Sequence, residues 1–315
     1  MTISRPPATW VVVVPLLLGA GCASAPVVCD LAHAPCTSTE SLESGGHKRT
    51  FLFHLPATHP EGPLPLVLSF HGRLGQGSSQ QALTDFDAIA DEKGWIVVYP
   101  DGLSRAWNDG REGNPNEDVD DVAFVDALIH EFVSSRGADP KRVFAMGFSN
   151  GGFFSQRLAC ERADRIVAVV TGVATLPEAE KDCKPARPIP VMLVLGSADP
   201  VVPYDGGVVA SDVPGRILSG PATRDAWIAA NGCDPEIVET AEPDTDPEDG
   251  TTVTRTESKN CPASRRVVLY TVNGGGHTWP SGPQYLGERW IGKTNRDVNA
   301  SKLSAEFFEA AGSLP

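Results

Sequence analysis

The sequence predicts an α/β fold with a mostly parallel central sheet and helices on both of its faces. Short, nearly continuous apolar runs, such as residues 64–70 (LPLVLSF) and 191–196 (VMLVLG), are typical of strands that are buried on both faces. Between such runs lie segments such as residues 122–132, where apolar residues recur every third or fourth position, as on one face of a helix. Strands that alternate with helices along the chain form parallel sheets.

The expected elements follow one another in a regular order. Residues 49–55 (RTFLFHL) and 95–100 (WIVVYP) are rich in β-branched and aromatic residues, which favour strands. The other expected strands have similar composition and span residues 64–70, 142–148, 165–170, 191–196 and 267–272. Helices are expected at residues 79–92 and 122–132, directly after Ser149, and at residues 300–311. The connection between strands 165–170 and 191–196 is too short for a large lid domain.

One segment interrupts this alternation. Residues 234–260 are acidic and polar, and Cys233 and Cys261 bound them. Such a segment cannot contribute to the core, so we expect a surface hairpin or loop.

Composition and charge indicate a globular protein and argue against one class of partner. The chain has 315 residues, and its 41% hydrophobic content is sufficient for a sizeable core. The 26 basic and 40 acidic residues give a formal net charge of -14. Because this charge repels phosphate backbones and anionic lipids, we expect no nucleic-acid partner.

The N-terminus has the features of an export signal. Arg5 precedes an apolar run at residues 10–18, and small residues then lead to Cys22. The segment LGAGC resembles a bacterial lipobox, which predicts a signal peptide of residues 1–21 and a lipid on Cys22 as the membrane attachment. The alternative is ordinary cleavage after residues 23–25 (ASA), where the following Pro26 is unfavourable. Residues 22–45 are expected to be a flexible tether, followed by a single domain at residues 46–315.

The cysteine count agrees with export. Seven cysteines are present, and assigning Cys22 to the lipid leaves six that can pair. Fifteen pairings are open, and order along the chain favours pairs of neighbours: Cys29 with Cys36, Cys160 with Cys183, and Cys233 with Cys261. The sequence has neither the C-x-x-C nor the H-E-x-x-H spacing that is typical of zinc sites, so we expect no metal.

Residues 147–151 (GFSNG) join an expected strand to an expected helix. In this context G-x-S-x-G predicts a sharp turn that presents the Ser149 hydroxyl above the carboxyl edge of the sheet. Gly147 and Gly151 allow the strand and the helix to approach closely. A serine hydroxyl is a poor nucleophile until a base accepts its proton, so a histidine and an orienting carboxylate are required.

Chain order selects these partners. His277 is the only histidine after Ser149, and it follows strand 267–272 through a flexible NGGG segment. Asp199 follows strand 191–196 and is the preferred acid, with Asp205 as the alternative. Developing charge on the substrate oxygen requires backbone N–H donors, for which we expect the amides of Asn150 and Arg73. His71 is interpreted as a residue that organises its loop.

Seven ordered blocks, among them LSFHG, DEKGWIVVYPDGL, GFSNGGFFSQRLAC, GSADPVVPYDGG and GGGHTWP, resemble the secreted polyhydroxybutyrate depolymerase and feruloyl esterase family of α/β-hydrolases, similar to carbohydrate esterase family 1. The resemblance runs from about residue 48 to residue 313. It implies an α/β-hydrolase fold and a catalytic triad at Ser149, Asp199 and His277. It also implies that Trp107 and Trp279 form walls of the substrate cleft, or else pack beneath loops.

Three further side chains depart from or extend this pattern. Arg73 stands where members of the family often have a small residue or cysteine, and its guanidinium could bind a substrate carboxylate or point to solvent. Asp120 and Asp121 are expected to cap or brace the start of a helix near the site.

The sequence therefore predicts an exported serine esterase that acts without a cofactor through an acyl-enzyme. The preferred substrates are polyhydroxybutyrate-type hydroxyalkanoate oligomers. The alternative is a feruloyl or acetyl xylan esterase that acts on plant polysaccharide esters. A more remote alternative, from another class, is a non-catalytic surface protein that uses the cleft for binding.

Overall fold

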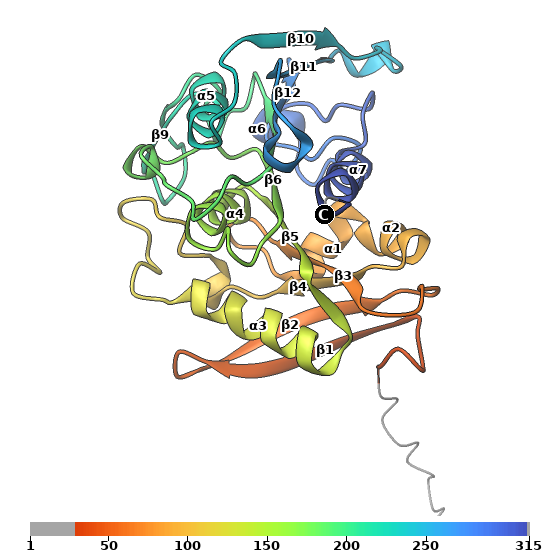
Figure 1. Ribbon diagram of the computed structural model, residues 1–315. Helices are drawn as coiled ribbons and strands as arrows, with labels where there is room; N and C mark the ends of the chain where they lie inside the picture. Colours follow the sequence, from red (N-terminus) through yellow and green to blue (C-terminus); the bar gives the residue numbers. More distant parts are fainter. Residues whose placement is uncertain (1–28, 314–315) are drawn as a thin grey trace, which may run out of the picture.

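The computed structural model describes residues 29–313 and contains a ten-stranded sheet (Figure 1). The strands lie in the order β1-β2-β4-β3-β5-β6-β7-β12-β11-β10. In chain order they are β1 (Cys36–Ser44), β2 (His47–Leu55), β3 (Leu64–Phe70), β4 (Ile96–Pro100), β5 (Ala138–Phe148), β6 (Ala168–Gly172), β7 (Val191–Gly196), β10 (Ile237–Ala241), β11 (Thr252–Ser258) and β12 (Val267–Asn273). Strands β4, β3, β5, β6, β7 and β12 pair in parallel, and the outer strands pair antiparallel.

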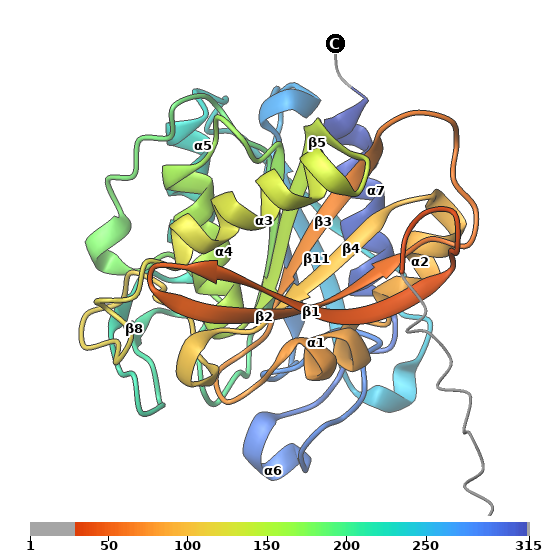
Figure 2. The ribbon, with the colours of Figure 1, turned by 90° about the horizontal axis from the view of Figure 1, so that it is seen from below.

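Helices cover both faces of this sheet, as Figures 1 and 2 show. One apolar layer joins the sheet to α3 (Asp121–Ser135), α4 (Asn150–Glu161) and α5 (Gly220–Ala230). The opposite layer packs against α2 (Phe86–Lys93) and α7 (Ala300–Gly312), with α1 (Gly77–Thr84) beside them. The remaining elements are short: α6 (Glu288–Ile291), β8 (Gly207–Val208), β9 (Arg216–Ile217), and single 3₁₀ turns at residues 103–105, 178–180, 247–249 and 263–265. The predicted α/β architecture is therefore confirmed.

The predicted helix at residues 79–92 is wrong in one respect. Two helices, α1 and α2, occupy this region, and Asp85 separates them in the left-handed conformation with φ 47°. The apolar spacing continues through the break, because the partly buried Leu83 of α1 packs in the same layer as Phe86 and Ile89 of α2. Periodicity alone could not reveal the change of direction.

The expected tether at residues 22–45 requires a larger correction. Residues 36–44 form the edge strand β1, which pairs with β2 through a turn at Gly45 and Gly46, both with positive φ. Alternate side chains of β1 are half-buried, including Cys36 and Leu42, which pack against the core. Although β1 has few apolar residues, it is stabilised by its backbone hydrogen bonds to β2 and by the packing of its one half-buried face. The expected signal peptide of residues 1–21 and the lipid site at Cys22 lie outside the described residues.

The acidic segment at residues 234–260 forms the expected hairpin. Strands β10 and β11 extend the main sheet on the side opposite β1. Disulfides join Cys29 to Cys36, Cys160 to Cys183, and Cys233 to Cys261. The last of these closes the base of the β10–β11 hairpin. Within residues 29–313, no helix combines the length and apolar character required to cross a bilayer.

The parallel strands bring several loops to one edge of the sheet. The segments that follow β3, β5, β7 and β12 all leave from the carboxyl ends of neighbouring parallel strands. In open α/β sheets, this edge is where ligands bind. Ser149, Asp199 and His277 follow β5, β7 and β12 and therefore gather here.

Candidate active site

Ser149 occupies the sharp turn between β5 and α4. Its backbone has φ 54° and ψ -117°, a conformation that non-glycine residues rarely adopt. A Cβ on Gly147 would lie 2.1 Å from the carbonyl oxygen of Gly151, and a Cβ on Gly151 would lie 2.2 Å from that of Phe70. The two glycines are therefore required by direct backbone contact, and the local geometry is that of the predicted nucleophile turn.

His277 and Asp199 form a buried pair. Nδ1 of His277 donates to Oδ2 of Asp199 over 2.7 Å, and the two side chains are 6% and 2% exposed. This bond places the ring proton on Nδ1 and leaves Nε2 as the nitrogen that can accept another proton. Oδ1 of Asp199 accepts the backbone N–H groups of Val201 and Val202 at 2.7 and 2.9 Å. Asp205, the alternative acid, is exposed.

Close backbone contacts join the loops that carry this pair. A Cβ on Gly196 would lie 2.4 Å from the carbonyl oxygens of both Gly275 and Gly276, so the ends of β7 and β12 touch directly. The amide of Ala198 also donates to the carbonyl of Gly275 at 2.9 Å. The glycine run before His277 thus permits the approach that brings the acid and the base together.

A second segment holds His277 from the other side. The amide of His277 donates to the carbonyl of Ile291 at 2.6 Å, and the hydroxyl of Tyr285 donates to the carbonyl of His277 at 2.8 Å. Burial and the nearby charge of Asp199 raise the pKa of the Tyr285 phenol well above its ordinary value. Tyr285 therefore remains a hydrogen-bond donor at alkaline pH.

Ser149 and His277 line the same cleft, which has a volume of about 230 Å³. Its other residues come from four loops, the end of β5, the start of α4 and the end of α6: Gly72, Arg73, Arg111, Phe148, Asn150, Phe153, Val201, Val209, Ser211, Tyr285, Leu286 and Ile291. The structure thus places the predicted serine and histidine on one surface, with Asp199 behind the histidine. This arrangement can perform nucleophilic acyl transfer.

The two expected oxyanion donors border this cleft. A Cβ on Gly72 would lie 3.4 Å from Cβ of Ser149, so the loop that contains Arg73 passes close to the nucleophile. The amide of Asn150 lies at the first turn of α4, where backbone N–H groups have no partner within the helix. Both residues thus border the cleft beside Ser149, and their role as oxyanion donors stays a prediction.

The side chain of Asn150 is fixed by a buried network. Its Oδ1 accepts the amide of Trp107 at 2.7 Å, and its Nδ2 donates to Oδ2 of Asp109 at 2.5 Å. Asp109 is fully buried and pairs with Arg111 at 2.7 Å. Asn114 donates to the other oxygen of Asp109 at 2.8 Å. Sequence reasoning missed Asp109 and Arg111, because nothing in the spacing of residues 107–114 relates them to residue 150.

The guanidinium of Arg73 has a partner that the sequence did not indicate. Its Nη2 donates to Asp212 at 2.5 Å, and its Nε lies 3.1 Å from the same carboxylate. This contact lowers the pKa of Asp212 and raises that of Arg73. The side chain therefore does not simply point to solvent, because it is bound to a carboxylate of the same chain, and its binding of a substrate carboxylate stays a prediction.

His71 organises its loop, as expected. Its Nε2 accepts the amide of Gly102 at 3.0 Å, so Nδ1 carries the proton and donates to the carbonyl of Gly72 at 2.8 Å. Burial lowers the pKa of the imidazole and favours this neutral form. Both ring nitrogens are occupied, so His71 is unsuited to act as a base for Ser149.

Trp107 and Trp279 are not walls of the cleft that contains Ser149. They are 0% and 1% exposed, and neither borders that cleft. Trp107 stacks on Phe154 and donates to the carbonyl of His71 at 3.0 Å. Trp279 donates to Ser301 at 2.9 Å and borders another cavity, near α7, which does not include Ser149 or His277. The indoles pack beneath the loops, since each finds there both an apolar surface and an acceptor for its N–H.

The two aspartates at the start of α3 have different roles. Asp120 caps the helix by accepting the amide of Ala123 at 2.9 Å, as predicted. Asp121 is buried and pairs with Arg49 at 2.6 Å, and burial raises its pKa. It also accepts the amide of Asn108 at 2.7 Å, so it braces the loop that leads to Asp109.

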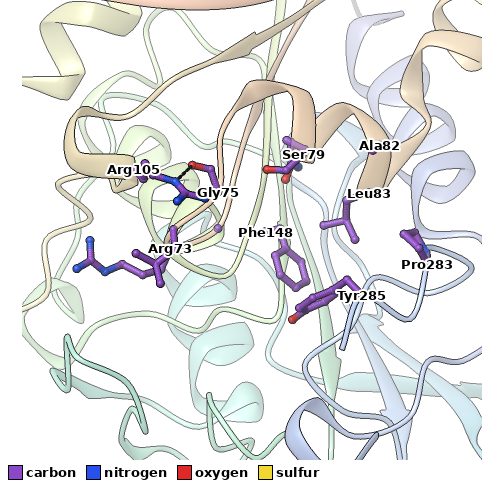
Figure 3. A pocket seen from close by; sticks show the side chains of 12 residues that line it. Arg73, Gly75, Ser79, Ala82, Leu83, Arg105, Phe148, Pro283 and Tyr285 are labelled. Atoms are coloured by element: carbon purple, nitrogen blue, oxygen red, sulfur yellow. Dashed lines mark hydrogen bonds between the residues drawn. The ribbon is translucent and has the colours of Figure 1, made fainter. Parts of the chain in front are cut away.

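A larger apolar cavity adjoins the cleft. Its volume is about 410 Å³, and it shares Gly72, Arg73, Phe148 and Tyr285 with the cleft. Figure 3 shows Leu83, Pro283 and Tyr285 around one end and Arg73 and Arg105 at the other, with Phe148 between them. The remaining lining residues are Leu74, Gly75, Ser79, Gln80 and Ala82. Sequence analysis did not identify this cavity, because its residues come from α1, the end of β5 and three separate loops.

Comparison with known proteins identifies relatives over most of the chain. The sequence is 31% identical over 284 residues to "Putative esterase NocK" of Nocardia uniformis subsp. tsuyamanensis, covering 86% of this chain and 82% of that protein. It is 34% identical over 223 residues to feruloyl esterase B of Piromyces equi, covering 68% of this chain and 39% of that enzyme. It is 28% identical over 256 residues to feruloyl esterase D of Neurospora crassa, covering 76% and 77% of the two chains.

Solved structures give the same fold. Acetyl xylan esterase from Aspergillus awamori superposes with a TM-score of 0.58 and 17% sequence identity, covering 87% of this chain and 100% of that one. No family model matches the sequence.

Proposed function

Because the chain belongs to the family of α/β-hydrolase esterases that includes these relatives, and is a carboxylic ester hydrolase, we propose that Ser149, His277 and Asp199 catalyse the hydrolysis of aryl or acetyl esters of plant polysaccharides. One observation carries the proposal. His277, which is bonded to Asp199, borders the same cleft as Ser149, and this cleft adjoins an apolar cavity.

In the first half of the reaction, Ser149 attacks the ester carbonyl and its hydroxyl proton passes to Nε2 of His277. The negative charge that develops on the carbonyl oxygen is stabilised by the amides of Asn150 and Arg73. Asp199 keeps the imidazole in the required tautomer and stabilises the imidazolium. The imidazolium then gives its proton to the leaving alcohol, and the acyl group remains on Ser149.

In the second half, water attacks the acyl-enzyme from the position that the alcohol has left. His277 accepts a proton from this water, and the same two amides stabilise the charge on the oxygen. Collapse of the intermediate returns the proton to Ser149 and releases the carboxylic acid. The reaction uses only groups of this chain and water.

The substrate class follows from the cavity and from the relatives. A cavity of about 410 Å³ lined by Leu74, Leu83, Phe148 and Pro283 is larger than an acetyl group needs and suits a flat aromatic acyl group. Two of the relatives are feruloyl esterases. Hydroxycinnamoyl esters are therefore favoured over the hydroxyalkanoate oligomers that the sequence led us to prefer, and acetyl esters are the second candidate.

We also propose an exported enzyme with a single catalytic domain that starts before β1. The three disulfides support export, because such bonds persist in oxidising compartments. Attachment through a lipid on Cys22 is proposed from the lipobox-like segment of the sequence.

The test compares four esters: methyl ferulate, a hydroxybutyrate trimer, acetylated xylan and p-nitrophenyl acetate. We expect the purified protein to hydrolyse methyl ferulate with the highest kcat/KM, and Ser149→Ala to reduce kcat for every substrate by about 10⁴-fold or more. Ser155→Ala is the control, since this hydroxyl is buried in α4 and bonded to the carbonyl of Gly151. A protein inactive on all four esters would favour the non-catalytic binding alternative, and preference for the trimer would restore the hydroxyalkanoate hypothesis.

A further inference from the structure

Residues 283–293, here called the α6 segment, project from the body of the protein (Figure 2). Every residue from 283 to 290 is exposed. Three of them are large and apolar, with exposed fractions of 40% for Tyr285, 52% for Leu286 and 63% for Trp290. Residues 29–313 contain six exposed side chains of this kind, so half of them lie in this one segment. Exposed apolar side chains that gather in this way are typical of an interaction site.

Hydrogen bonds fix the backbone of the α6 segment. Nε2 of Gln284 donates to the carbonyls of Leu286 and Gly292 at 2.8 and 3.0 Å, which ties the two ends of the segment together. Oε1 of the same residue accepts the hydroxyl of Thr294 at 2.6 Å. Trp290 therefore stands on a fixed scaffold, and a ligand that contacts its ring does not have to order the segment first.

One border of the α6 segment belongs to the cleft. Leu286 and Ile291 line the cleft that contains Ser149, and Trp290 directly precedes Ile291 in α6. Trp290 does not line the apolar cavity. In the proposed function the acyl group occupies that cavity, so the alcohol portion of the ester extends past another border of the cleft, and the α6 segment forms one.

A polar cavity of about 500 Å³ also borders the α6 segment. All eight residues that line it are polar or charged. Gln284, Glu288 and Lys293 line it from the α6 segment or its end, and Asp246 and Glu248 line it from the β10–β11 hairpin. The α6 segment thus presents apolar side chains toward the cleft and polar side chains toward this second cavity.

A chain of sugar residues fits this combination. A pyranose ring has an apolar C–H face that packs on an aromatic ring, and hydroxyl groups at its rim that bind carboxylate and amide groups. An apolar polymer would instead remove water from the charges of Glu288 and Lys293 without replacing it. A second copy of this chain is disfavoured by the net charge of -14, because like charges repel.

We propose that the α6 segment binds the carbohydrate portion of the ester and that a sugar ring stacks on Trp290. The sugar chain then passes from the cleft over Trp290 toward the polar cavity. The inference rests on the proposed function and adds to it the site of the alcohol portion. Because this contact is remote from the reacting carbonyl, it is made equally in the ground state and in the transition state, and it affects KM more than kcat.

The experiment keeps the acyl group constant and varies the alcohol. Methyl ferulate and a feruloylated arabinoxylan oligosaccharide are compared in wild type and Trp290→Ala. We expect KM for the oligosaccharide ester to rise about fivefold or more in the variant, whereas its kcat and both constants for methyl ferulate stay within about twofold. Trp290→Phe retains an aromatic ring and therefore most of the affinity. An acetylated xylo-oligosaccharide and p-nitrophenyl acetate repeat the comparison with the other candidate acyl group.

Binding without hydrolysis gives a second measurement. The four other tryptophans of residues 29–313 are at most 5% exposed, so a sugar that stacks on Trp290 alters the fluorescence of this one ring. We expect xylohexaose to change the tryptophan emission of Ser149→Ala and to leave that of Ser149→Ala/Trp290→Ala unchanged. Val238→Ala is the matched control, since Val238 is 42% exposed on β10 and lines neither the cleft nor the polar cavity.

The outcomes separate this inference from the proposed function. Equal changes of KM for both ferulate esters in Trp290→Ala, or no change for either, overturn the role of Trp290 and leave the esterase intact. Dimerisation that is lost in Trp290→Ala, or binding to a polyhydroxybutyrate film in preference to xylan, would assign the surface to a second copy or to an apolar polymer and also overturns it. Wild type that hydrolyses none of the four esters contradicts the proposed function, and the titration with xylohexaose then still tests Trp290.

Discussion

His277 and Asp199 lie 78 residues apart in the chain and share a hydrogen bond of 2.7 Å at the carboxyl edge of the sheet. The second oxygen of Asp199 is held by two backbone amides, so the carboxylate cannot rotate away from the imidazole without losing these bonds. The same aspartate thus forms the turn after β7 and orients the base.

Substitution of Asp199 tests whether Asp199 or Asp205 is the carboxylate that orients His277. We expect Asp199→Asn to reduce kcat by about 10⁴-fold, because the amide favours the wrong imidazole tautomer. Asp205→Asn, on the exposed part of the same loop, should change kcat less than about twofold. Steady-state hydrolysis of p-nitrophenyl acetate measures both. Equal losses in the two variants would contradict the assignment.

Tyr285→Phe tests the support of His277 from the second loop. Loss of the hydrogen bond to the His277 carbonyl should reduce kcat/KM by roughly fivefold, which corresponds to about 1 kcal/mol. Since the pKa of Tyr285 is raised, its hydroxyl stays protonated at alkaline pH, and the alkaline limb of the activity profile should be the same in wild type and variant. If the alkaline limb of the wild-type profile is absent from the variant, the loss of activity at high pH is due to ionisation of Tyr285 instead.

The raised pKa also predicts how stability depends on pH. The folded protein binds the phenolic proton more tightly than the unfolded chain does, so this contribution to stability is fully present below about pH 10 and decreases at higher pH. Urea unfolding of wild type and Tyr285→Phe should therefore differ most below about pH 10, and a difference that grows above it would contradict this sign.

Asp109→Asn tests whether the buried network positions the amide of Asn150. The substitution keeps the shape of the side chain but removes the charge that binds both Asn150 and Arg111. We expect kcat to fall by about tenfold with little change in KM, because the transition state depends on the oxyanion donor more than substrate binding does.

The control for this variant is Asp126→Asn. Asp126 pairs with Arg162 and Arg165 between α3 and α4, so its variant loses an ion pair without reaching the cleft. A comparable loss of kcat in both variants would indicate a general structural effect. A rise of KM alone in Asp109→Asn would indicate a role in substrate binding.

The disulfides should contribute unequally to stability. Cys233 and Cys261 are separated by 28 residues and close the β10–β11 hairpin, whereas Cys29 and Cys36 are separated by 7. Loop entropy predicts a loss of about 3 to 4 kcal/mol for the Cys233→Ala/Cys261→Ala pair and about 2 to 3 kcal/mol for the Cys29→Ala/Cys36→Ala pair. Urea denaturation measures both, and a reversed order would contradict the entropic explanation.

The parallel core was predictable from sequence because its strands are buried on both faces. Residues such as those of β3 and β7 are apolar at nearly every position, so composition alone identifies them. Ser149 and His277 were predictable because each follows such a strand through small residues. Strand β1 was not, since its CTSTESLES sequence covers only one half-buried face, although the Gly-Gly pair before β2 is typical of a two-residue hairpin turn.

The surroundings of the triad depend on contacts that no spacing reveals. Arg73 and Asp212 are 139 residues apart and meet because the loop after β3 lies beside the β8–β9 connection. Trp107 and Trp279 have the residue type expected in the wall of a substrate cleft. They are nevertheless buried, because the loops fold over them. Such side-chain partners depend on how the loops fold over the sheet, which local sequence does not specify.

The composition of β1 has a further consequence for how separate molecules of the protein meet. A terminal strand presents unpaired N–H and C=O groups to which another chain can add by β-pairing, a common start of aggregation. In β1 the solvent-facing positions carry Thr37, Thr39, Ser41 and Glu43, and its neighbour across the turn contributes Lys48. These polar and charged side chains disfavour apolar packing between the β1 edges of two molecules. The features that made β1 hard to recognise in the sequence thus protect the sheet from polymerising with copies of itself.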